Sequence, residues 1–267
     1  MQRLLPFDVH QVQEVYSGAE GRLWELVMGE QIHIGGLKSS MDLAEKAVIA
    51  PGSAGIDLCC CTGAGMRFLM RFCDADRMMG VDFTEAAIET GRRRCAQEGL
   101  AESIRFTLAD VRQTGLPGAQ ADFVWGEDAW CYVPDKPALI AEAVRLTRPG
   151  GTIAFTDWIT GPEPMSDKES ERLLAFMKFP DMESLAGYRG LIERNGCQVL
   201  AAEDTGRFAR HVDLYLDMLN LQLSYDALKI IGFDMALMQA LGGEMEWMRQ
   251  LAYQGKIAQG LFVARKE

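Results

Sequence analysis

The chain has 267 residues, of which 48% are hydrophobic and 24% charged, so it is long enough to bury one sizeable core. Its net charge of -11 disfavours nucleic acid as a partner, because such binding depends largely on Lys and Arg side chains. No apolar run approaches the roughly 20 residues that span a bilayer, and the N-terminal stretch lacks the apolar core of a secretory signal. We therefore expect one cytoplasmic globular domain, residues 1–267, that does not bind a membrane and takes a small, neutral or cationic ligand.

Residues 1–50 look mainly helical, and from about residue 50 short apolar runs alternate with helical patterns. This alternation is typical of a parallel sheet that is covered by helices on both faces. The apolar runs predict seven strands, at 55–61, 77–83, 103–110, 121–128, 151–158, 197–204 and 258–265. The sequence therefore predicts an α/β fold with a Rossmann-like, seven-stranded, mostly parallel sheet.

Helical stretches lie between these strands, at about 65–74, from Thr84 onward and at 136–146. Thr84 is a favourable N-cap residue, and the acidic residue after it suits the positive end of a helix. A further helical segment, at about 206–255, is inserted between the sixth and seventh strands. We expect Gly242-Gly243 to break this Met-rich insert into two helices, so that it could act as a lid or an oligomer contact.

The first predicted strand runs into a turn with two glycines, Gly63 and Gly65, and then into a helix. Glycine allows a close approach of the backbone to a ligand and leaves amide N–H groups free to donate. In an open α/β sheet the ligand binds beyond the carboxyl ends of the strands. Three acidic residues, Asp57, Asp82 and Asp110, belong to the first three strands, and we expect them to converge on this edge.

The spacing of the acids favours a nucleoside cofactor. Asp82 lies 25 residues after Asp57, where an acidic residue can accept hydrogen bonds from both ribose hydroxyls. Asp110 could accept from an adenine amino group while the Val111 amide donates to a ring nitrogen. Phe68 stands where a GxGxxG motif has its third glycine, so the turn is poorly suited to bind a pyrophosphate. The arrangement suits S-adenosyl-L-methionine, whose amino acid tail and sulfonium carry positive charge.

Five segments resemble, in order, the motifs of class I S-adenosylmethionine-dependent methyltransferases: GIDLCCCTGAG, GVDFTEAAIETGR, FTLADV, VPDKPALIAEAVRLTRPGG and GLFVARK. In addition, GEQIHIGG resembles the signature of the sarcosine/dimethylglycine N-methyltransferase group. The resemblance implies S-adenosyl-L-methionine as the cofactor. It also implies methyl transfer to a small-molecule acceptor, in the first place an amine nitrogen.

The resemblance divides the chain into a helical extension (1–50), a cofactor-binding core (51–160) and a substrate-side region (161–267). Residues near Gly63 would hold the methionine part of the cofactor, Asp82 the ribose, and Phe83 would flank the adenine. Nine residues are expected to bind the cofactor: Asp57, Cys59, Gly63, Gly65, Asp82, Phe83, Asp110, Val111 and Glu127.

Four residues are expected to act on the methyl acceptor: Tyr16, His33, Asp128 and Trp130. Methyl transfer from a sulfonium is an in-line displacement that depends mostly on placing the nucleophile and excluding water. Proton removal matters if the amine arrives protonated, and His33 is our first choice for it, ahead of His211. Tyr16 and Trp130 could contact a cationic or ring-bearing acceptor, although side chains of these types also commonly pack in a core.

The seven cysteines form no CxxC pair, so we expect neither a metal site nor a disulfide framework. Strand alternation would send Cys59 and Cys61 to one face of the sheet and Cys60 to the other. Three other functions stay open. The acceptor atom could be oxygen, sulfur or carbon, the chain could be a nicotinamide-dependent oxidoreductase, or it could bind S-adenosyl-L-methionine without catalysis. A homodimer is also left open.

Overall fold

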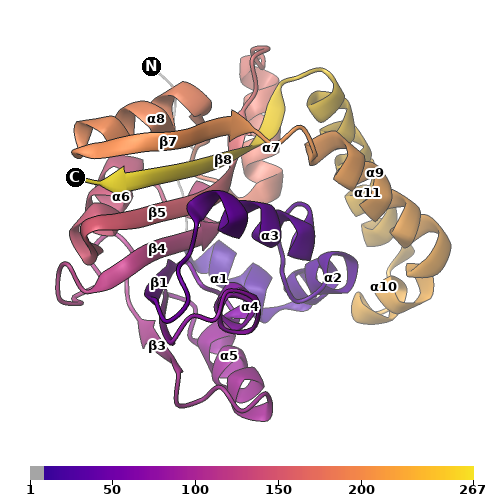
Figure 1. Ribbon diagram of the computed structural model, residues 1–267. Coiled ribbons are helices and arrows are strands. Elements are labelled where there is room, and N and C mark those ends of the chain that lie inside the picture. Colours follow the sequence, from indigo (N-terminus) through magenta and orange to yellow (C-terminus); the bar gives the residue numbers. More distant parts are fainter. Residues whose placement is uncertain (1–8) are drawn as a thin grey trace.

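The computed structural model describes residues 9–267 and contains one mixed sheet with helices on both faces (Figure 1). The strand order is β3-β2-β1-β4-β5-β8-β7, and the short β6 pairs with β5. Strands β1 to β5 pair in parallel, whereas β8 is antiparallel to both of its neighbours. The strands are β1 (Ala54–Leu58), β2 (Arg77–Asp82), β3 (Ile104–Leu108), β4 (Ala121–Glu127), β5 (Thr147–Thr160), β6 (Glu183–Ser184), β7 (Cys197–Asp204) and β8 (Ile257–Lys266).

The helices form three groups around this sheet. One face carries α3 (Gly36–Ala47), α4 (Ala64–Phe72) and α5 (Glu85–Gln97), and the opposite face carries α6 (Lys136–Leu146) and α8 (Leu185–Arg194). Strand side chains alternate between the two faces: Val124 packs on the α6 side, while Phe123 and Trp125 pack on the α4 side. The predicted fold class is therefore confirmed.

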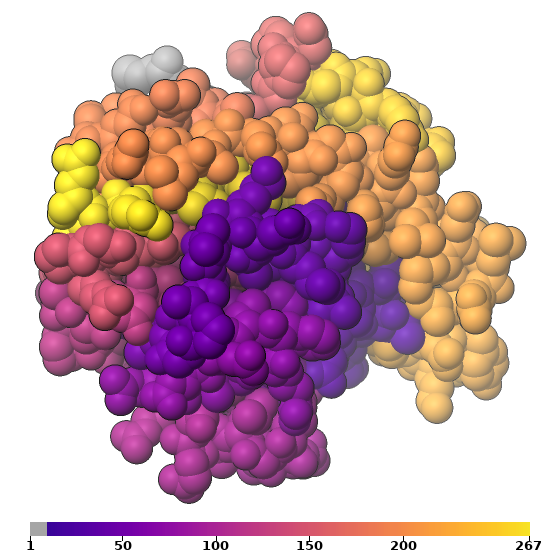
Figure 2. All heavy atoms as spheres, viewed as in Figure 1, coloured from indigo at the N-terminus to yellow at the C-terminus, as the bar shows by residue number. Residues whose placement is uncertain are grey.

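The third group of helices lies beyond the carboxyl ends of the strands. It comprises α1 (Val9–Ser17), α2 (Ala19–Met28), α7 (Asp167–Met177), α9 (Phe208–Asp217), α10 (Ser224–Ile230) and α11 (Met235–Tyr253). A buried cluster that includes Trp158, Phe179 and Phe208 joins most of these helices to the end of β5. Figure 2 shows the N-terminal helices, in indigo, between the magenta core and the orange helices, whose outer part projects from the molecule.

The predicted strands are all present, but the first one ends earlier than expected. Strand β1 stops at Leu58, whereas we predicted a strand through Cys61. Cys59 and Cys61 have φ values of 65° and 47°, in the left-handed region, so the chain is already turning. The amides of Cys59 and Cys60 both donate to the Val81 carbonyl, at 2.9 and 3.2 Å, which ends the regular ladder. The cysteines therefore form a turn at the sheet edge and do not alternate along a strand.

The predicted break at Gly242-Gly243 is wrong. Helix α11 runs without interruption from Met235 to Tyr253, and neither glycine has a positive φ. A glycine costs a helix about 1 kcal/mol relative to alanine, which the strong helix formers around the pair can offset. The predicted helical extension of residues 1–50 corresponds to α1, α2 and α3, with its first eight residues outside the described part of the chain. Among residues 9–267, no helix combines the length and apolarity needed to cross a bilayer.

A buried polar network fixes the segment that follows β4. Asp157 is fully buried and accepts hydrogen bonds from the Cys131 amide at 2.9 Å and the Tyr188 hydroxyl at 2.5 Å. Lys136, which is 2% exposed, donates to the Val133 carbonyl and to Asp181. Both charged side chains thus hold residues 131–133 in place. Burial raises the pKa of Asp157 from 3.8 to about 7, although the Lys136 ammonium acts against this rise.

The raised pKa of Asp157 predicts that stability falls as pH rises. Between about pH 4 and pH 7 the folded state binds more protons than the unfolded state, so this group lowers the free energy of unfolding by at most about 1.4 kcal/mol per pH unit. Replacing Asp157 by Asn should make that fall shallower. Urea unfolding of both proteins from about pH 5 to pH 7 measures the two slopes, and the exposed Asp217→Asn should match the unmodified protein. Equal slopes for Asp157→Asn would refute the assignment.

Candidate functional site

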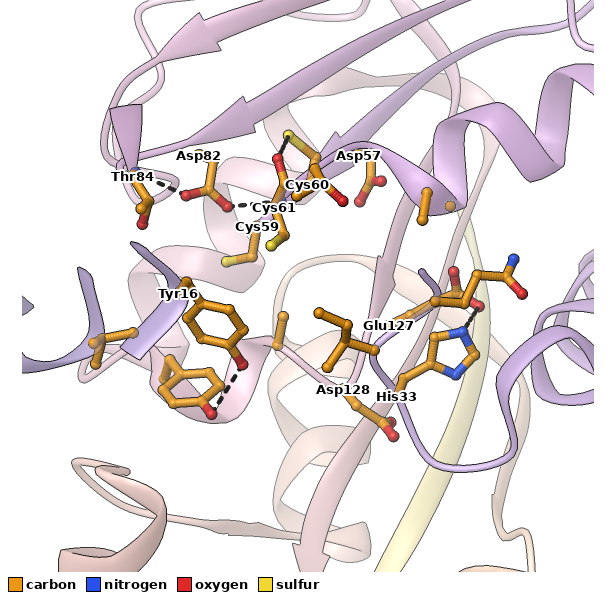
Figure 3. A pocket seen from close by; sticks show the side chains of 18 of the residues that line it. Tyr16, His33, Asp57, Cys59, Cys60, Cys61, Asp82, Thr84, Glu127 and Asp128 are labelled. Atoms are coloured by element: carbon orange, nitrogen blue, oxygen red, sulfur yellow. Dashed lines mark hydrogen bonds and ion pairs between the residues drawn. The ribbon is translucent and has the colours of Figure 1, made fainter. Parts of the chain in front are cut away.

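A pocket opens at the carboxyl ends of β1, β2 and β4. This is the switch point of the sheet, because β2 and β3 lie on one side of β1 whereas β4 and β5 lie on the other. It holds about 790 Å³ of space, part of it open to solvent, and five carboxylic acids line it: Glu30, Asp57, Asp82, Glu127 and Asp128. We call it the acid pocket. Nine predicted site residues line it, all but Gly65 and Phe83 labelled in Figure 3: Tyr16, His33, Asp57, Cys59, Gly65, Asp82, Phe83, Glu127 and Asp128.

The two glycines of the first turn have different functions. Gly63 caps α4 with a φ of 73°, and a Cβ placed there would lie 2.7 Å from the Phe106 ring. It therefore shapes the turn from behind and does not line the pocket. Gly65 does line the pocket, and a Cβ there would lie 2.8 Å from Glu127 Oε2 and 3.3 Å from Asp57 Oδ2. A side chain would therefore clash with the Glu127 carboxylate, and glycine lets the backbone pass close to both acids.

Asp82 closes the turn on its other side. One carboxylate oxygen accepts from the Cys61 amide and the other from the Thr84 amide, both at 2.8 Å. Thr84 precedes α5 as predicted, but its own side chain makes no capping hydrogen bond. Burial raises the pKa of Asp82, and hydrogen bonds from these two amides oppose the rise.

Asp57 is 4% exposed, and its pKa is raised well above the ordinary value by burial and then by the charges of Glu127 and Asp82. Several acids in one buried space repel each other, so a cation or a group with several N–H or O–H donors would relieve the repulsion. The acid pocket is therefore suited to a positively charged, donor-rich ligand.

His33, Ser40 and Glu127 form a hydrogen-bonded triangle at the back of the pocket. Ser40 Oγ donates to Glu127 Oε1 at 2.6 Å, and His33 Nε2 lies 3.3 Å from the same oxygen and 3.2 Å from Ser40 Oγ. His33 is 4% exposed, and its Nδ1 is buried without a hydrogen-bond partner. One ring nitrogen of His33 is thus engaged by the protein, and the other is buried without a hydrogen-bond partner.

Asp128 is occupied by contacts within the protein. Its Oδ2 accepts from the Ile34 amide at 2.8 Å and from Gln259 Nε2 at 2.7 Å. Its φ of 50° lies in the left-handed region, where Asp is tolerated better than most residues. The carboxylate therefore ties the loop of residues 29–35 to strands β4 and β8, and its side chain positions that loop.

Tyr16 and Tyr132 lie beside each other in the lining of the pocket and form a hydroxyl pair, with the Tyr16 hydroxyl bond drawn dashed in Figure 3. The Tyr16 hydroxyl donates to the Tyr132 hydroxyl at 3.0 Å, and the rings meet edge to face at 5.8 Å between centroids. Burial raises the pKa of both phenols, so both hydroxyls stay neutral and able to donate and accept. Sequence reasoning missed Tyr132 and Ser40; Tyr132 lies two residues beyond the aromatic residue that was chosen.

The structure places Trp130 in the core, which corrects the prediction that it contacts the acceptor. Its ring is fully buried, stacks on Phe155 at 4.0 Å between centroids, and donates to the Leu58 carbonyl. Three predicted cofactor residues also lie outside the lining of the acid pocket: Gly63, Asp110 and Val111. The Asp110 carboxylate is half exposed and pairs with Arg112, whose guanidinium lowers the pKa of Asp110. Val111 packs in the core.

The other histidines lie outside the acid pocket as well. His211, on α9, bonds to the Arg207 carbonyl at 2.9 Å, and His10 is exposed on α1 near Gln13. Cys60 and Cys61 line the pocket with Cys59. Burial raises the pKa of all three thiols, that of Cys61 to about 12, so they stay protonated at neutral pH.

A second, smaller cavity adjoins the acid pocket and shares five of its lining residues: Tyr16, Ile32, His33, Asp128 and Tyr132. Its remaining lining is mostly aromatic and sulfur-containing, with Trp24, Trp158, Phe179, Met28 and Met177. We call it the aromatic pocket. The hydroxyl pair and His33 thus stand where two chemically different spaces meet.

Comparison with known families and proteins finds methyltransferases. Residues 56–155 match the family described as methyltransferase domain. Phosphoethanolamine N-methyltransferase 1 of Arabidopsis thaliana is 26% identical over 196 residues, which cover 73% of this chain and 39% of that protein. The 27-O-demethylrifamycin SV methyltransferase of Amycolatopsis mediterranei is 24% identical over 79% of this chain and 80% of its own length. This chain spans half or less of the plant phosphoethanolamine N-methyltransferases that it matches.

Solved structures share the fold at low sequence identity. A protein from Galdieria sulphuraria, provisionally described as a sarcosine dimethylglycine methyltransferase, superposes with a TM-score of 0.82 at 20% identity, over 93% of this chain and 97% of that one. Phosphoethanolamine N-methyltransferase 2 of Haemonchus contortus, solved in complex with S-adenosyl-L-methionine, gives a TM-score of 0.87 at 16% identity, over 98% of this chain and 60% of that one.

Proposed function

From the methyltransferase domain and the class I S-adenosylmethionine-dependent fold of this chain, we propose that it transfers a methyl group from S-adenosyl-L-methionine to a small amine. The observation that carries the proposal is the pairing of an acid pocket with an adjoining aromatic pocket at the switch point of the sheet. The first offers several carboxylates to a positively charged cofactor, and the second offers space for an acceptor.

The residues of the acid pocket fit S-adenosyl-L-methionine. Asp57 and Glu127 line the pocket next to Gly65, and their carboxylates would hold the α-ammonium group. Trp125 Nε1 also lies near Gly65, 3.4 Å from the position of a Gly65 Cβ, and is buried without a hydrogen-bond partner. It could donate to the carboxylate of the methionine tail. Asp82 would hold the ribose, as the spacing of the acids predicts, and Phe83 would flank the adenine.

When bound, the cofactor would supply a methyl group that its sulfonium already activates. The protein's contribution is then to position the acceptor and to exclude water. Tyr16, Tyr132 and His33 line both pockets and so would lie beside the reacting nitrogen. Since His33 Nδ1 has no partner, it could accept the proton of an amine that arrives protonated.

The five acids of the acid pocket, which adjoins the aromatic pocket, support an amine over other acceptors, because an amine carries N–H donors and often a positive charge. Named N-methyltransferases among the similar proteins agree with this choice. Transfer to oxygen or carbon is the alternative, and the similar proteins include a sterol 24-C-methyltransferase of Eremothecium gossypii, 24% identical over 70% of this chain.

Calorimetry and product assays test the proposal. We expect S-adenosyl-L-methionine to bind and nicotinamide dinucleotides not to bind. Release of S-adenosylhomocysteine should then follow from at least one acceptor in a screen of glycine, sarcosine, dimethylglycine and aromatic amines. Failure of S-adenosyl-L-methionine to bind would overturn the proposal. Turnover with a hydroxyl, thiol or carbon acceptor, and with no amine, would show that the proposed acceptor class is wrong and that the proposed methyl transfer is right.

A further inference from the structure

The aromatic pocket is a rigid structure. Phe179 meets Tyr132 edge to face at 4.8 Å between centroids and meets Trp158 in the same way at 5.4 Å. Trp158 packs edge to face on Phe208 at 4.6 Å. Trp158 and Phe179 are 5% and 3% exposed, so their rings are held by the surrounding core. A ligand must therefore match this surface, because the rings have little freedom to rearrange.

The charge of the aromatic pocket is the second observation. Of the described residues that line it, only His33 and Asp128 are ionisable apart from the two tyrosines, and none is Lys or Arg. Lys178 lies between two lining residues in the chain, but its ammonium binds Glu20 at 2.8 Å. A phosphate ester carries a charge of about -1.5 to -2 at pH 7 and is usually bound by Arg or Lys.

The acid pocket does not supply the missing cation. Its described lining also contains no Lys or Arg. Arg67 and Arg94 lie behind the turn at Thr62, and their guanidinium groups are bound to Glu30 and Glu25. An anionic group on the acceptor would thus be buried next to carboxylates with no cation to pair with it, which costs several kcal/mol.

The aromatic pocket thus has fixed rings, and its described lining has no Lys or Arg. We infer that the acceptor is an amine whose remaining part is apolar or aromatic and carries neither phosphate nor carboxylate. The inference rests on the proposed function and narrows it. It excludes as acceptors phosphoethanolamine, which the names of several similar proteins give as a substrate, and sarcosine and dimethylglycine, which carry a carboxylate.

The hydroxyl pair gives the amine its orientation. Because the Tyr16 hydroxyl donates to Tyr132, the Tyr16 oxygen keeps its lone pairs to accept an N–H of the amine. Hydrogen bonding through N–H leaves the nitrogen lone pair free to face the methyl group. The rings of Tyr16, Trp24 and Trp158 line the aromatic pocket and can meanwhile contact the body of the acceptor or a positive charge on it.

The test compares binding of two amines in the presence of S-adenosylhomocysteine, by calorimetry. We expect phenethylamine to bind at least about tenfold more tightly than phosphoethanolamine. Tyr16→Phe should weaken phenethylamine about 3- to 10-fold and S-adenosylhomocysteine by a smaller factor, whereas Tyr225→Phe, at an exposed tyrosine, should change neither. Tighter binding of phosphoethanolamine than phenethylamine would overturn the inference while leaving the proposed function intact. If the unmodified protein does not bind S-adenosylhomocysteine, the proposed function itself is refuted.

A gain of function provides a second test. Met28 lines the aromatic pocket and is half-buried, so Met28→Lys brings an ammonium group to it. We expect this variant to bind phosphoethanolamine at least about fivefold more tightly than the unmodified protein, while Met41→Lys, at an exposed position on α3, should have no effect. An equal effect of both lysines, or none from Met28→Lys, would show that a missing cation does not set the specificity.

Discussion

Replacing Asp82 by alanine is expected to weaken the binding of S-adenosyl-L-methionine by roughly 30- to 1,000-fold. The carboxylate is buried at the end of β2, and each oxygen still has capacity for a further hydrogen bond beyond those from Cys61 and Thr84. Hydrogen bonds to a charged group are worth about 1.5–3 kcal/mol each, so losing the ribose contacts costs about 2–4 kcal/mol. Calorimetric titration of the variant with S-adenosyl-L-methionine measures the change.

The matched control for this variant is Asp76→Ala. Asp76 is exposed immediately before the other end of the same strand, so its removal should leave the affinity within about twofold. Asp82 also closes the turn at Cys61, and thermal unfolding of the variant must therefore be measured beside its affinity. A folded Asp82→Ala protein with unchanged affinity would show that the ribose site lies elsewhere.

Replacing Trp130 by alanine is expected to lower the free energy of unfolding by about 3–5 kcal/mol. The fully buried indole stacks on Phe155 and donates to the Leu58 carbonyl, so alanine leaves a cavity and an unpaired buried carbonyl. Urea unfolding of the unmodified protein and the variant at 25 °C measures the difference. Trp130→Phe should lose less, because a second ring retains most of the volume.

Trp247 offers the control for this substitution. It is partly exposed on α11, where its ring lies 4.1 Å from the Arg172 guanidinium carbon, so Trp247→Ala should lose only about 1–2 kcal/mol. If Trp130 contacted the acceptor, as the sequence suggested, Trp130→Ala would keep its stability and lose acceptor affinity. That combination would contradict the core position of Trp130.

The alternation of elements was predictable from the sequence because it depends on local patterns. Apolar runs, helix-forming stretches and the glycine turn act within about ten residues of the chain, and they located all seven long strands. Two acids of the site, Asp57 and Asp82, followed from the same patterns, and Glu127 followed from the family resemblance. These residues belong to β1, β2 and β4, and parallel strands bring their carboxyl ends to one edge.

Sheet order could not be predicted in the same way, and this explains Asp110. Its position at a strand end was predicted correctly within two residues, but β3 is one of the two edge strands of the sheet. At that edge the Asp110 carboxylate is half exposed and pairs with Arg112, and it does not line the acid pocket. Which strand lies at an edge depends on pairing between distant segments, and the local pattern contains no information on it.

The choice between Trp130 and Tyr132 was decided by tertiary structure alone. Both are aromatic residues in the short segment after β4, and Asp157, from β5, holds the amide of Cys131 between them. That contact turns Trp130 into the core and Tyr132 toward Tyr16, which is 116 residues away in the chain. The sequence by itself thus determined the strands, the glycine turn and the acids at the strand ends. Only long-range packing decided which aromatic side chains line the aromatic pocket, because it brings α1, α2, β5 and α7 together there.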